Sequence, residues 1–367
     1  MTRNDVQLGV VGLGNIGHYH ADRLTELGAN LVGGMDIDSD ARADFSEKFD
    51  VPTFEDHAEL FEQVDAVVVT TPNKFHEQYA VDALEADIDV LLEKPLADTV
   101  ESAERIVAAA READSFCMVG FHSRYHHQAE IIKDQQTTGR FGDVTHVEAN
   151  YVRRRGIPGR GSWFTAENVA GGGSLIDIGV HAIDLALHFL DYPEVVEVSG
   201  TARSEFGTNE DYAYVDMWGD DQGADHFDVD DSATALIRCA GGQTISLEVA
   251  WATNRPPTQE FFVRGTEAGA RFDKSSGDLE LYEAGQGGAH HLSTTEVETR
   301  SHDPHRQEQV AFLEAVASGQ PPERNTVDEA LTVQRVIEAI YRSGETGRAV
   351  RLDEEVESDA DAPVAND

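Results

Sequence analysis

Four ionisable residues in the stretch Gly171–Leu190 have the spacing of one helix face. They follow one another at steps of four, three and four residues, and they are Asp177, His181, Asp184 and His188. Residues at such steps lie on one side of a helix, and apolar residues at the same spacing predict an adjacent side that packs on a core. A carboxylate and an imidazole presented together can bind a hydroxyl group and accept its proton. The alternative is a solvated face on a surface helix.

The beginning of this helix is predicted at Ser174, because serine is a common N-cap. Asp177 would then lie in the first turn, where the helix dipole favours a carboxylate. The three glycines before Ser174 leave the backbone thin where a ligand could approach closely. We expect Asp184 to be a buried structural acid. No metal site is predicted, because Asp177 and His181 are only two ligands.

A lysine follows a short apolar run in the sequence Glu93-Lys94-Pro95. The run at residues 88–92 predicts a buried strand, so Lys94 would lie at its carboxyl edge, with Pro95 fixing the turn. The chain contains only five lysines, so a surface role explains this one less readily. A second strand end carries polar residues in the sequence Thr70-Thr71-Pro72-Asn73, with His76 one turn further on.

The N-terminal region has the pattern of a dinucleotide-binding turn. A predicted strand at residues 7–11 breaks at the sequence Gly12-Leu13-Gly14-Asn15-Ile16-Gly17, and a helix and a second strand follow. Gly12 would form the turn, Gly14 would admit a pyrophosphate, and Gly17 would let the helix pack closely on the strand. The pyrophosphate would lie on the helix N-terminus.

The second strand ends in Asp36, which lies 22 residues after Gly14. A carboxylate at this place can bind the ribose hydroxyls of a dinucleotide and repels a 2′-phosphate. We therefore expect NAD as cofactor. NADP is possible, because Arg42 could compensate for the carboxylate.

Strand and helix patterns alternate through the first 122 residues. Further strands are predicted at 65–70, 88–92 and 116–121, with helices at 75–86 and 101–113. Repeated units of this length build a doubly wound parallel sheet, so residues 1–122 are predicted to form an α/β Rossmann domain. Ligands of such sheets lie beyond the carboxyl ends of the strands, where Lys94 is expected.

The composition is strongly acidic along the whole chain. Among 367 residues there are 69 Asp and Glu against 28 Lys and Arg, which gives a formal net charge of −41. Such a surface repels nucleic acid and anionic membranes, so neither is expected as a partner. The most economical explanation is a cytoplasm at very high salt, where screening removes the self-repulsion. The composition therefore suggests a halophile.

The sequence also indicates the compartment. Cys117 and Cys239 lie in apolar contexts and are predicted to be core residues, which excludes a disulfide framework. The N-terminus has no apolar secretory segment, and no later run reaches the roughly 18 apolar residues of a membrane span. A soluble, cytoplasmic protein is expected.

Three motifs occur in one order: the glycine motif at 12–17, the triplet Glu93-Lys94-Pro95, and the segment Asp177–Asp184, which reads DIGVHAID. Together they closely resemble the Gfo/Idh/MocA family of NAD(P)-dependent oxidoreductases, from about residue 6 to residue 352. The glycine motif alone is weak, whereas the lysine triplet followed by the aspartate–histidine motif is specific. The resemblance implies a Rossmann domain followed by an α+β domain with a large, mainly antiparallel open sheet.

The resemblance also implies roles for individual residues. Lys94 would contact the nicotinamide ribose and the substrate hydroxyl, Asp177 would line the pocket, and His181 would accept the proton. The implied cofactor-binding residues are Gly12, Gly14, Asn15, Ile16, Gly17, Asp36, Thr71, Pro72, Asn73, His76, Glu93 and Lys94. Substrate contacts are implied for His122, Arg124 and Trp163. The chain has His122 where many members of the family have asparagine.

Residues 123–352 are predicted to form a substrate-binding and oligomerisation domain. Strands are predicted at 143–153, 195–202, 232–239, 244–251, 260–264 and 278–282, and helices at 302–318 and 327–342. The resemblance implies that the free face of the sheet pairs with another subunit in a homodimer or homotetramer. The segment 205–231 is predicted to be a loop, and the acidic residues 353–367 a disordered tail.

Four arginines lie within eight positions, at Arg153, Arg154, Arg155 and Arg160. They could bind a carboxylate or phosphate of the substrate, since guanidinium groups bind such anions in bidentate fashion. They could instead pair with acidic neighbours at an interface or at the domain junction. The sequence leaves both interpretations open.

The predicted reaction is oxidation of a sugar or polyol hydroxyl by hydride transfer to NAD(P). His181 would be the general base, and Lys94 would stabilise the alkoxide. One alternative is an NAD-dependent glycosidase without net redox change. Another is a non-catalytic dinucleotide-binding sensor or regulator.

Overall fold

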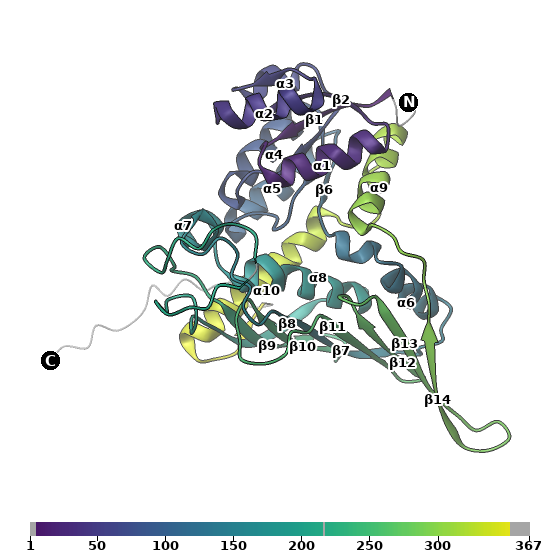
Figure 1. Ribbon diagram of the computed structural model, residues 1–367. Coiled ribbons are helices and arrows are strands. Elements are labelled where there is room, and N and C mark those ends of the chain that lie inside the picture. Colours follow the sequence, from purple (N-terminus) through teal and green to yellow (C-terminus); the bar gives the residue numbers. More distant parts are fainter. Residues whose placement is uncertain (1–4, 216, 353–367) are drawn as a thin grey trace, which may run out of the picture.

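Two sheets, one above the other, organise the chain (Figure 1). The computed structural model describes residues 5–215 and 217–352. The upper sheet is parallel, with the strand order β3-β2-β1-β4-β5-β6. This order is that of a Rossmann fold, as the sequence predicts. Its strands are β1 (Gln7–Val11), β2 (Asn30–Met35), β3 (Thr53–Phe54), β4 (Ala66–Val69), β5 (Asp89–Leu92) and β6 (Cys117–Val119).

Both faces of the upper sheet are covered by apolar packing. Alternate residues of β4 belong to different core clusters, Val67 and Val69 to one and Ala66 and Val68 to the other. A strand buried on both faces reads as a continuous apolar run, which explains the sequence AVVV. The helices of this region are α1 (Asn15–Glu26), α2 (Ser39–Phe49), α3 (His57–Phe61), α4 (His76–Glu85) and α5 (Val100–Glu112).

One helix crosses the predicted domain boundary. Helix α9 (Pro304–Ser318) belongs by sequence to the second domain, but it packs on the first sheet. Phe312 and Leu313 are buried in the same cluster as Leu8 of β1. The chain therefore returns to the Rossmann domain after its second sheet, and Figure 1 shows α9 beside β6.

The lower sheet has nine strands in the order β14-β13-β12-β11-β7-β10-β9-β8-β15. The β7–β10 pair is parallel and the other neighbours are antiparallel. The mainly antiparallel open sheet predicted from the resemblance is therefore confirmed. Its strands are β7 (Val144–Val152), β8 (Val195–Arg203), β9 (Ser232–Cys239), β10 (Thr244–Ala250), β11 (Glu260–Gly265), β12 (Ala268–Asp273), β13 (Asp278–Gly285), β14 (His291–Val297) and β15 (Val350–Arg351).

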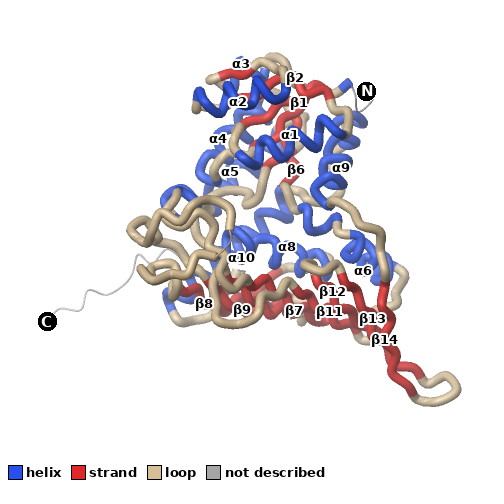
Figure 2. Tube along the Cα trace, viewed as in Figure 1, coloured by secondary structure: helices blue, strands red, loops and turns tan. Residues whose placement is uncertain are grey.

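Helices cover one face of the lower sheet, between it and the upper domain (Figure 2). They are α6 (His127–Thr137), α8 (Val180–Phe189) and α10 (Val327–Thr346), with the short α7 (Glu167–Ala170) nearby. Three strands of the lower sheet were not predicted from the sequence, namely β12, β14 and β15, and β3 of the upper sheet was not predicted either. β14 is mostly exposed and polar, so it lacks the alternation of a half-buried strand.

The central helix differs from its prediction. Leu175–Gly179, labelled η5, forms a turn of π-helix, and the regular helix α8 begins only at Val180. Ser174 stands at the N-cap position of this segment, as predicted, but its side chain does not cap it, because the hydroxyl group donates to Asp230 Oδ2 at 2.6 Å. Asp230 also accepts the backbone N–H groups of Gly173 and Leu175, at 2.9 Å each. A carboxylate distant in sequence thus holds the beginning of the helix.

The three glycines before this helix pack against the protein, so the expected exposure to a ligand is wrong. A Cβ atom on Gly171 would lie 2.5 Å from the Asp98 carbonyl oxygen, and one on Gly173 would lie 1.8 Å from the Asp230 carbonyl oxygen. The interpretation as a solvated helix face is also wrong, since His181 is 6% exposed and Asp184 is fully buried. Nearly the whole helix is core.

This buried helix has membrane-like composition. The stretch Glu167–Phe189 is long and apolar enough to cross a membrane, contrary to the expectation that no such run exists. However, 83% of its most apolar window is buried inside the protein, as in the core helix of a soluble protein.

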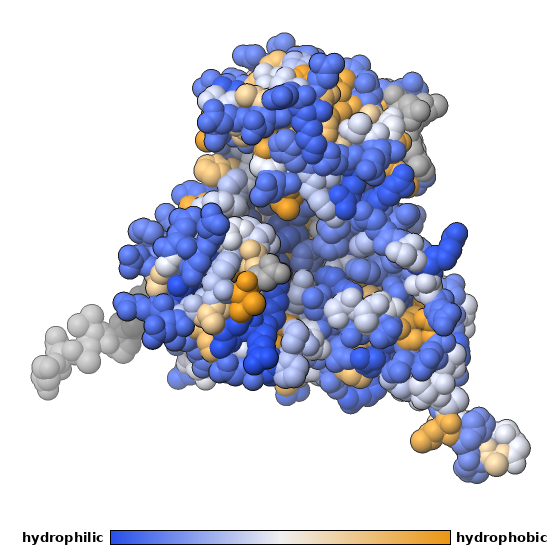
Figure 3. Space-filling model, in the orientation of Figure 1, coloured by the Kyte–Doolittle hydropathy of each residue, from blue (hydrophilic) through white to orange (hydrophobic). Residues whose placement is uncertain are grey.

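The remaining expectations concern the cysteines, the long loop and the tail. Cys117 and Cys239 are free and buried, which confirms that they are core residues. The segment 205–231 is mainly loop where it is described. The predicted tail, 353–367, lies outside the described residues. Figure 3 shows a mostly hydrophilic face, hollowed between the upper and lower domains.

Candidate active site

An ion pair joins the two domains at the carboxyl end of β5. Lys94 Nζ lies 3.0 Å from Asp177 Oδ1 and also donates to the Asp177 carbonyl oxygen at 3.2 Å. Lys94 lies at the junction of the domains because it follows the buried strand β5, separated from its last residue, Leu92, by Glu93 alone. Asp177 lies in the π-helical turn, a geometry that recurs at functional sites. The second oxygen, Oδ2, accepts the indole N–H of Trp251 at 2.9 Å.

Both members of this pair remain charged. Burial by itself lowers the pKa of Lys94, but the carboxylates of Asp177 and Glu93 outweigh it and raise that pKa above its ordinary value. Burial raises the pKa of Asp177, but Lys94 and then Arg153 outweigh it and lower that pKa. The site therefore holds a fixed ammonium group beside a fixed carboxylate.

His181 lies one helical turn after Asp177, in the first turn of α8. Its Nδ1 atom is buried and has no hydrogen-bond partner among the described residues. Burial, followed by the charges of Lys94 and Lys274, holds the pKa of His181 well below its ordinary value of 6.5. The imidazole is therefore neutral near pH 7 and able to accept a proton.

Two further imidazoles adjoin His181. The ring of His122 meets that of His181 edge-on, with 4.7 Å between centroids, and stacks on His305 at 3.6 Å. His122 thus lies in the site, as the resemblance implies. Sequence reasoning missed His305, because this residue belongs to no recognisable motif. It reaches the site because α9 returns to the Rossmann domain.

Sequence reasoning also missed Lys274, whereas Arg153 belongs to the arginine cluster whose role the sequence left open. Arg153 Nη1 lies 3.9 Å from Asp177 Oδ2, and Lys274 Nζ donates to Ser123 Oγ at 2.9 Å. Lys274 Nζ also lies 4.9 Å from the ring centre of Tyr151. Burial by itself raises the pKa of Tyr151, but the charges of Lys274 and Arg153 outweigh it and lower that pKa. Both cations come from the lower sheet and face the catalytic residues.

The arginine cluster divides between structure and site. Arg160 is buried and pairs with Asp221 at 2.8 Å. Arg155 donates to the Thr253 carbonyl oxygen at 2.6 Å. Arg154 is exposed, so Arg153 alone of the four faces the catalytic residues.

Arg124 is not part of this site. Its guanidinium is fully buried and pairs with Asp184 at 2.6 Å and Glu329 at 2.8 Å. This network confirms Asp184 as a buried structural acid, and it leaves Arg124 enclosed by protein. Trp163 is 45% exposed and meets Phe164, which in turn lies 5.9 Å from Trp251. It therefore lies at the rim.

The glycine turn has the geometry that a dinucleotide requires. Gly12 has φ +92°, a conformation that favours glycine, and a Cβ atom on Gly17 would lie 2.1 Å from the Gly12 carbonyl oxygen. A Cβ atom on Gly14 would meet nothing within 4 Å, so the space beside the helix N-terminus is open. Asn15 and Ile16 are exposed in the first turn of α1. These residues fit a pyrophosphate.

Asp36 lies beside this turn. Its carboxylate accepts the backbone N–H groups of Leu13 at 2.7 Å and Asp38 at 2.9 Å. These two contacts fix both oxygens at the end of β2, and each oxygen keeps further acceptor capacity for a hydroxyl. Arg42 donates to the Asp36 carbonyl oxygen at 2.7 Å, so a cation stands next to the carboxylate.

The loop that follows β4, at residues 70–76, is held in place by hydrogen bonds within the protein. His76 is buried, with one ring nitrogen 2.9 Å from the Thr71 carbonyl oxygen and the other 2.9 Å from that of Pro95. Asn73 donates its side-chain N–H to the Ala170 carbonyl oxygen at 2.7 Å. These contacts give both residues a positioning role, while Thr71 and Pro72 form the surface of the loop.

Glu93 ties the lysine turn to the glycine helix. Its carboxylate lies 2.7 Å from His20 Nε2 of α1. Burial by itself raises the pKa of Glu93, but His20 and Lys94 outweigh it and lower that pKa to about 2. Glu93 is therefore a permanent anion that fixes the turn carrying Lys94.

A doubly wound sheet whose glycine turn faces a lysine, a carboxylate and a neutral imidazole defines a dinucleotide-dependent oxidoreductase. Residues 6–121 match the family model described as an oxidoreductase family with an NAD-binding Rossmann fold, and residues 130–271 match the GFO/IDH/MocA C-terminal domain. The chain belongs to the Gfo/Idh/MocA oxidoreductase family.

Known proteins resemble the chain over most of its length. D-glucoside 3-dehydrogenase of Escherichia coli is 28% identical over 365 residues, covering 96% of this chain and 99% of the relative. A putative UDP-kanosamine synthase oxidoreductase subunit of Amycolatopsis mediterranei is 31% identical over 261 residues, covering 68% and 70%. A levoglucosan dehydrogenase solved with NADH shares the fold, with a TM-score of 0.82, 21% identity, and coverage of 95% and 100%.

Proposed function

We propose that this protein is an NAD-dependent dehydrogenase that oxidises a hydroxyl group of a sugar or polyol. The observation that carries the proposal is the Lys94–Asp177 ion pair beside neutral His181, at the carboxyl edge of a dinucleotide-binding sheet. Relatives named as D-glucoside, glucose-6-phosphate and inositol dehydrogenases support this substrate class.

The cofactor would bind along the upper sheet. Gly12, Gly14 and Gly17, with Asn15 and Ile16, would hold its pyrophosphate at the N-terminus of α1. Asp36 would bind the adenosine ribose, and the loops around Thr71, Pro72, Glu93 and Lys94 would line the nicotinamide side. When bound, NAD supplies a hydride acceptor.

The chain's own residues would manage the proton and the charge of the hydroxyl group. His181, being neutral and buried, accepts the hydroxyl proton as the hydride departs. Lys94 donates a hydrogen bond to the oxygen as negative charge develops there. Asp177 orients Lys94 and can accept a hydrogen bond from a second substrate hydroxyl.

A substrate screen tests this function. Sugars and polyols are offered with NAD or NADP in molar salt, and the absorbance of the reduced cofactor is followed. We expect reduced cofactor to accumulate with at least one of them. Release of an aglycone without accumulation of reduced cofactor would indicate the glycosidase alternative and contradict the proposal.

The cofactor preference should depend on Asp36. We expect wild type to have a higher kcat/KM with NAD, and Asp36→Ser to lower that value by about 10- to 100-fold, the loss of hydrogen bonds to a charged group. The serine no longer repels a 2′-phosphate, so the difference in kcat/KM between NAD and NADP should become smaller. Asp40→Ser, on the exposed first turn of α2, is the control. Faster wild-type turnover with NADP would contradict this prediction.

The acidic composition predicts a requirement for salt. With 69 acidic and 28 basic residues, the surface self-repels until salt screens it. We expect the melting temperature and the activity to fall together on dialysis from molar KCl into dilute buffer. An unchanged melting temperature would refute the halophilic interpretation.

The lower sheet also offers a surface for assembly. One face of the lower sheet carries no helix in the described chain, as Figure 2 shows. We propose that this face joins copies of the chain into a homodimer or homotetramer in the cytoplasm.

A further inference from the structure

The substrate side of the candidate site has an excess of positive charge. Lys94, Lys274 and Arg153 all act on His181 and, after burial, help to lower its pKa. Asp177 is the carboxylate that pairs with Lys94 and Arg153, and no other ion pair of these three cations occurs within the described residues. In a chain of net charge −41, a group of three cations near the carboxylates of Asp177 and Glu93 is unexpected.

Lys274 is the least compensated of the three. It follows β12, and its Nζ atom contacts a hydroxyl group, Ser123 Oγ, and the face of Tyr151. In the part of the chain that the structure describes, it forms no ion pair. Burial lowers the pKa of Lys274, and the like charges of Arg153 and Lys94 lower it further. A buried ammonium without a carboxylate is costly unless a ligand supplies the counter-charge.

Lys133, a half-buried lysine outside the site, provides the contrast. Lys133 is 19% exposed and pairs with Asp191 at 2.5 Å. With 69 acidic residues available, a carboxylate partner for Lys274 would be easy to provide. Asp184 is a carboxylate whose charge acts on Lys274, and it is engaged by Arg124. Its isolation therefore indicates a position reserved for an anion from outside the chain.

Arg153 lies next to this position. Its Nη1 atom donates to the Gly156 carbonyl oxygen at 3.2 Å and lies 3.9 Å from Asp177, which is too long for a bidentate pair. The Arg153 side chain is 21% exposed, so part of it remains accessible to a ligand from solvent. Arg153 Cζ lies 5.5 Å and Lys274 Nζ 4.9 Å from the ring centre of Tyr151. A guanidinium and an ammonium group near one ring suit an oxyanion with several acceptor oxygens.

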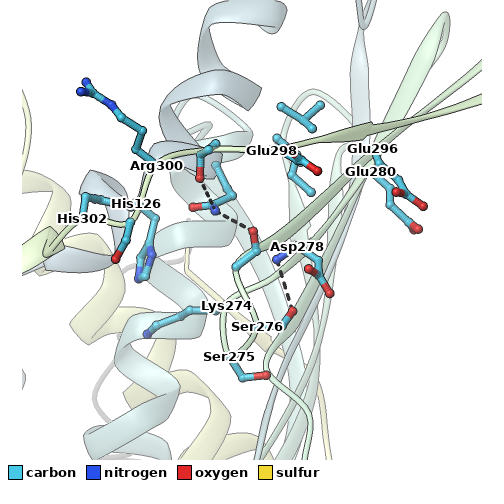
Figure 4. Close-up of a pocket in the computed structure, with 16 residues that line it drawn as sticks. His126, Lys274, Ser275, Ser276, Asp278, Glu280, Glu296, Glu298, Arg300 and His302 are labelled. Carbon is cyan, nitrogen blue, oxygen red and sulfur yellow. Dashed lines mark hydrogen bonds between the residues drawn. The ribbon is translucent and has the colours of Figure 1, made fainter.

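The open cleft on the other side of Lys274 does not suit an anion. This cleft, of about 720 Å³, is lined by the carboxylates Asp278, Glu280, Glu296 and Glu298. Figure 4 shows Lys274 pointing away from Asp278 and Glu280 and lying beneath His126. The ammonium group therefore serves the catalytic side.

We propose that the substrate is an anionic sugar or polyol, whose carboxylate or phosphate group binds between Lys274 and Arg153 while Lys94 receives the reacting hydroxyl group. The inference rests on the proposed function and deepens it by naming the substrate class. Salt screens the long-range field of the acidic surface but weakens a partly buried contact with a cation much less, so Lys274 and Arg153 would bind such an anion directly.

The test compares matched neutral and anionic substrates at constant ionic strength. Hexoses, pentoses and inositols are each assayed beside their carboxylic acids and their phosphate esters, with wild type, Lys274→Gln, Arg153→Gln and the control Arg154→Gln. Arg154 is an exposed neighbour outside the site. The assays with the carboxylic acids and those with the phosphate esters show which of the two anions the site recognises.

We expect wild type to prefer an anionic member of one series. Lys274→Gln and Arg153→Gln should each lower kcat/KM for that member by about 10- to 100-fold, chiefly through KM, as expected for loss of a hydrogen bond to a charged group. The deciding quantity is the ratio of kcat/KM for the anionic member to kcat/KM for its neutral counterpart. This ratio should fall about 10-fold or more in Lys274→Gln and Arg153→Gln and stay unchanged in Arg154→Gln. A merely structural role would lower both values together, with a lower melting temperature.

Other outcomes overturn the inference. A wild-type preference for neutral members, or an equal loss on neutral and anionic members in the variants, would refute the anionic substrate and leave the dehydrogenase intact. If no neutral or anionic member is oxidised, the proposed function fails and the inference fails with it.

Discussion

Replacing His181 with alanine should lower kcat by about 10²- to 10⁴-fold, the usual contribution of a positioned general base. The imidazole is buried, neutral and one turn from Asp177, and its Nδ1 atom has no partner within the described residues. Binding of NAD should be nearly unchanged, because the residues proposed to hold the cofactor lie on the upper sheet. Stopped-flow rates and a cofactor titration measure the two effects separately.

The pH dependence gives a second readout of His181. Its pKa is lowered well below 6.5, so the base form is present above that lowered value and is lost as the pH falls through it. We expect wild-type kcat/KM to stay level from neutral pH down to below 6.5 and to fall only at more acidic pH. His181→Ala should lack this acidic limb.

A matched control is His226→Ala, in an exposed part of the long loop. This variant should keep both the rate and the pH profile of wild type. Near-normal turnover of His181→Ala with an unchanged acidic limb would place the base elsewhere. Asp177, one helical turn before His181, would then be the candidate.

Replacing Lys94 with alanine should lower kcat by about 10²- to 10³-fold, comparable to loss of one donor to a developing oxyanion. The variant should also bind substrate more weakly, since the ammonium group would contact the hydroxyl before it reacts. Lys94→Arg should not restore activity, because a planar guanidinium cannot replace a compact ammonium group at one oxygen.

Loss of Lys94 also removes the main counter-charge of a buried carboxylate. Asp177 would keep Trp251 and the more distant Arg153. We therefore expect Lys94→Ala to melt at a lower temperature, and the double variant Lys94→Ala/Asp177→Asn to recover part of that loss without regaining activity. This pattern separates the catalytic effect from the folding effect.

The control for this pair is Lys133→Ala, which breaks another lysine–aspartate pair outside the site, with the exposed Asp191. It should leave turnover and substrate affinity unchanged. Normal turnover of Lys94→Ala on a substrate that wild type oxidises would contradict the assigned role. The resemblance of the Glu93-Lys94-Pro95 triplet would then be misleading about the chemistry.

The features that the sequence predicted correctly are local ones. The glycine turn at 12–17 is recognisable because its conformation and close packing require glycine at Gly12 and Gly17. The apolar run of β5 places Lys94 at a strand end, and the four-residue step from Asp177 to His181 places both on one side of the helical segment. Each inference depends on a few consecutive residues, which is the range over which backbone periodicity operates.

The errors in the helix prediction have a tertiary cause. A pattern of helical spacing cannot tell a regular helix from one that begins with a π-helical turn, and it assigned a capping role to Ser174. In the structure Asp230, 56 residues away, accepts the Ser174 hydroxyl and the neighbouring backbone N–H groups. The packing of a distant loop thus determines where the helix begins.

The composition of the catalytic site was also decided by the tertiary structure. Lys94 meets Asp177 across 83 residues, and Lys274 meets Ser123 across 151. Arg124, adjacent in sequence to Ser123, is buried with Asp184 instead, and His305 enters only because α9 packs on the first sheet. The sequence by itself determined which residues could do chemistry. Which of them share one charged, partly dehydrated space depends on how two sheets and their helices pack, because burial and pairing are properties of neighbours distant along the chain.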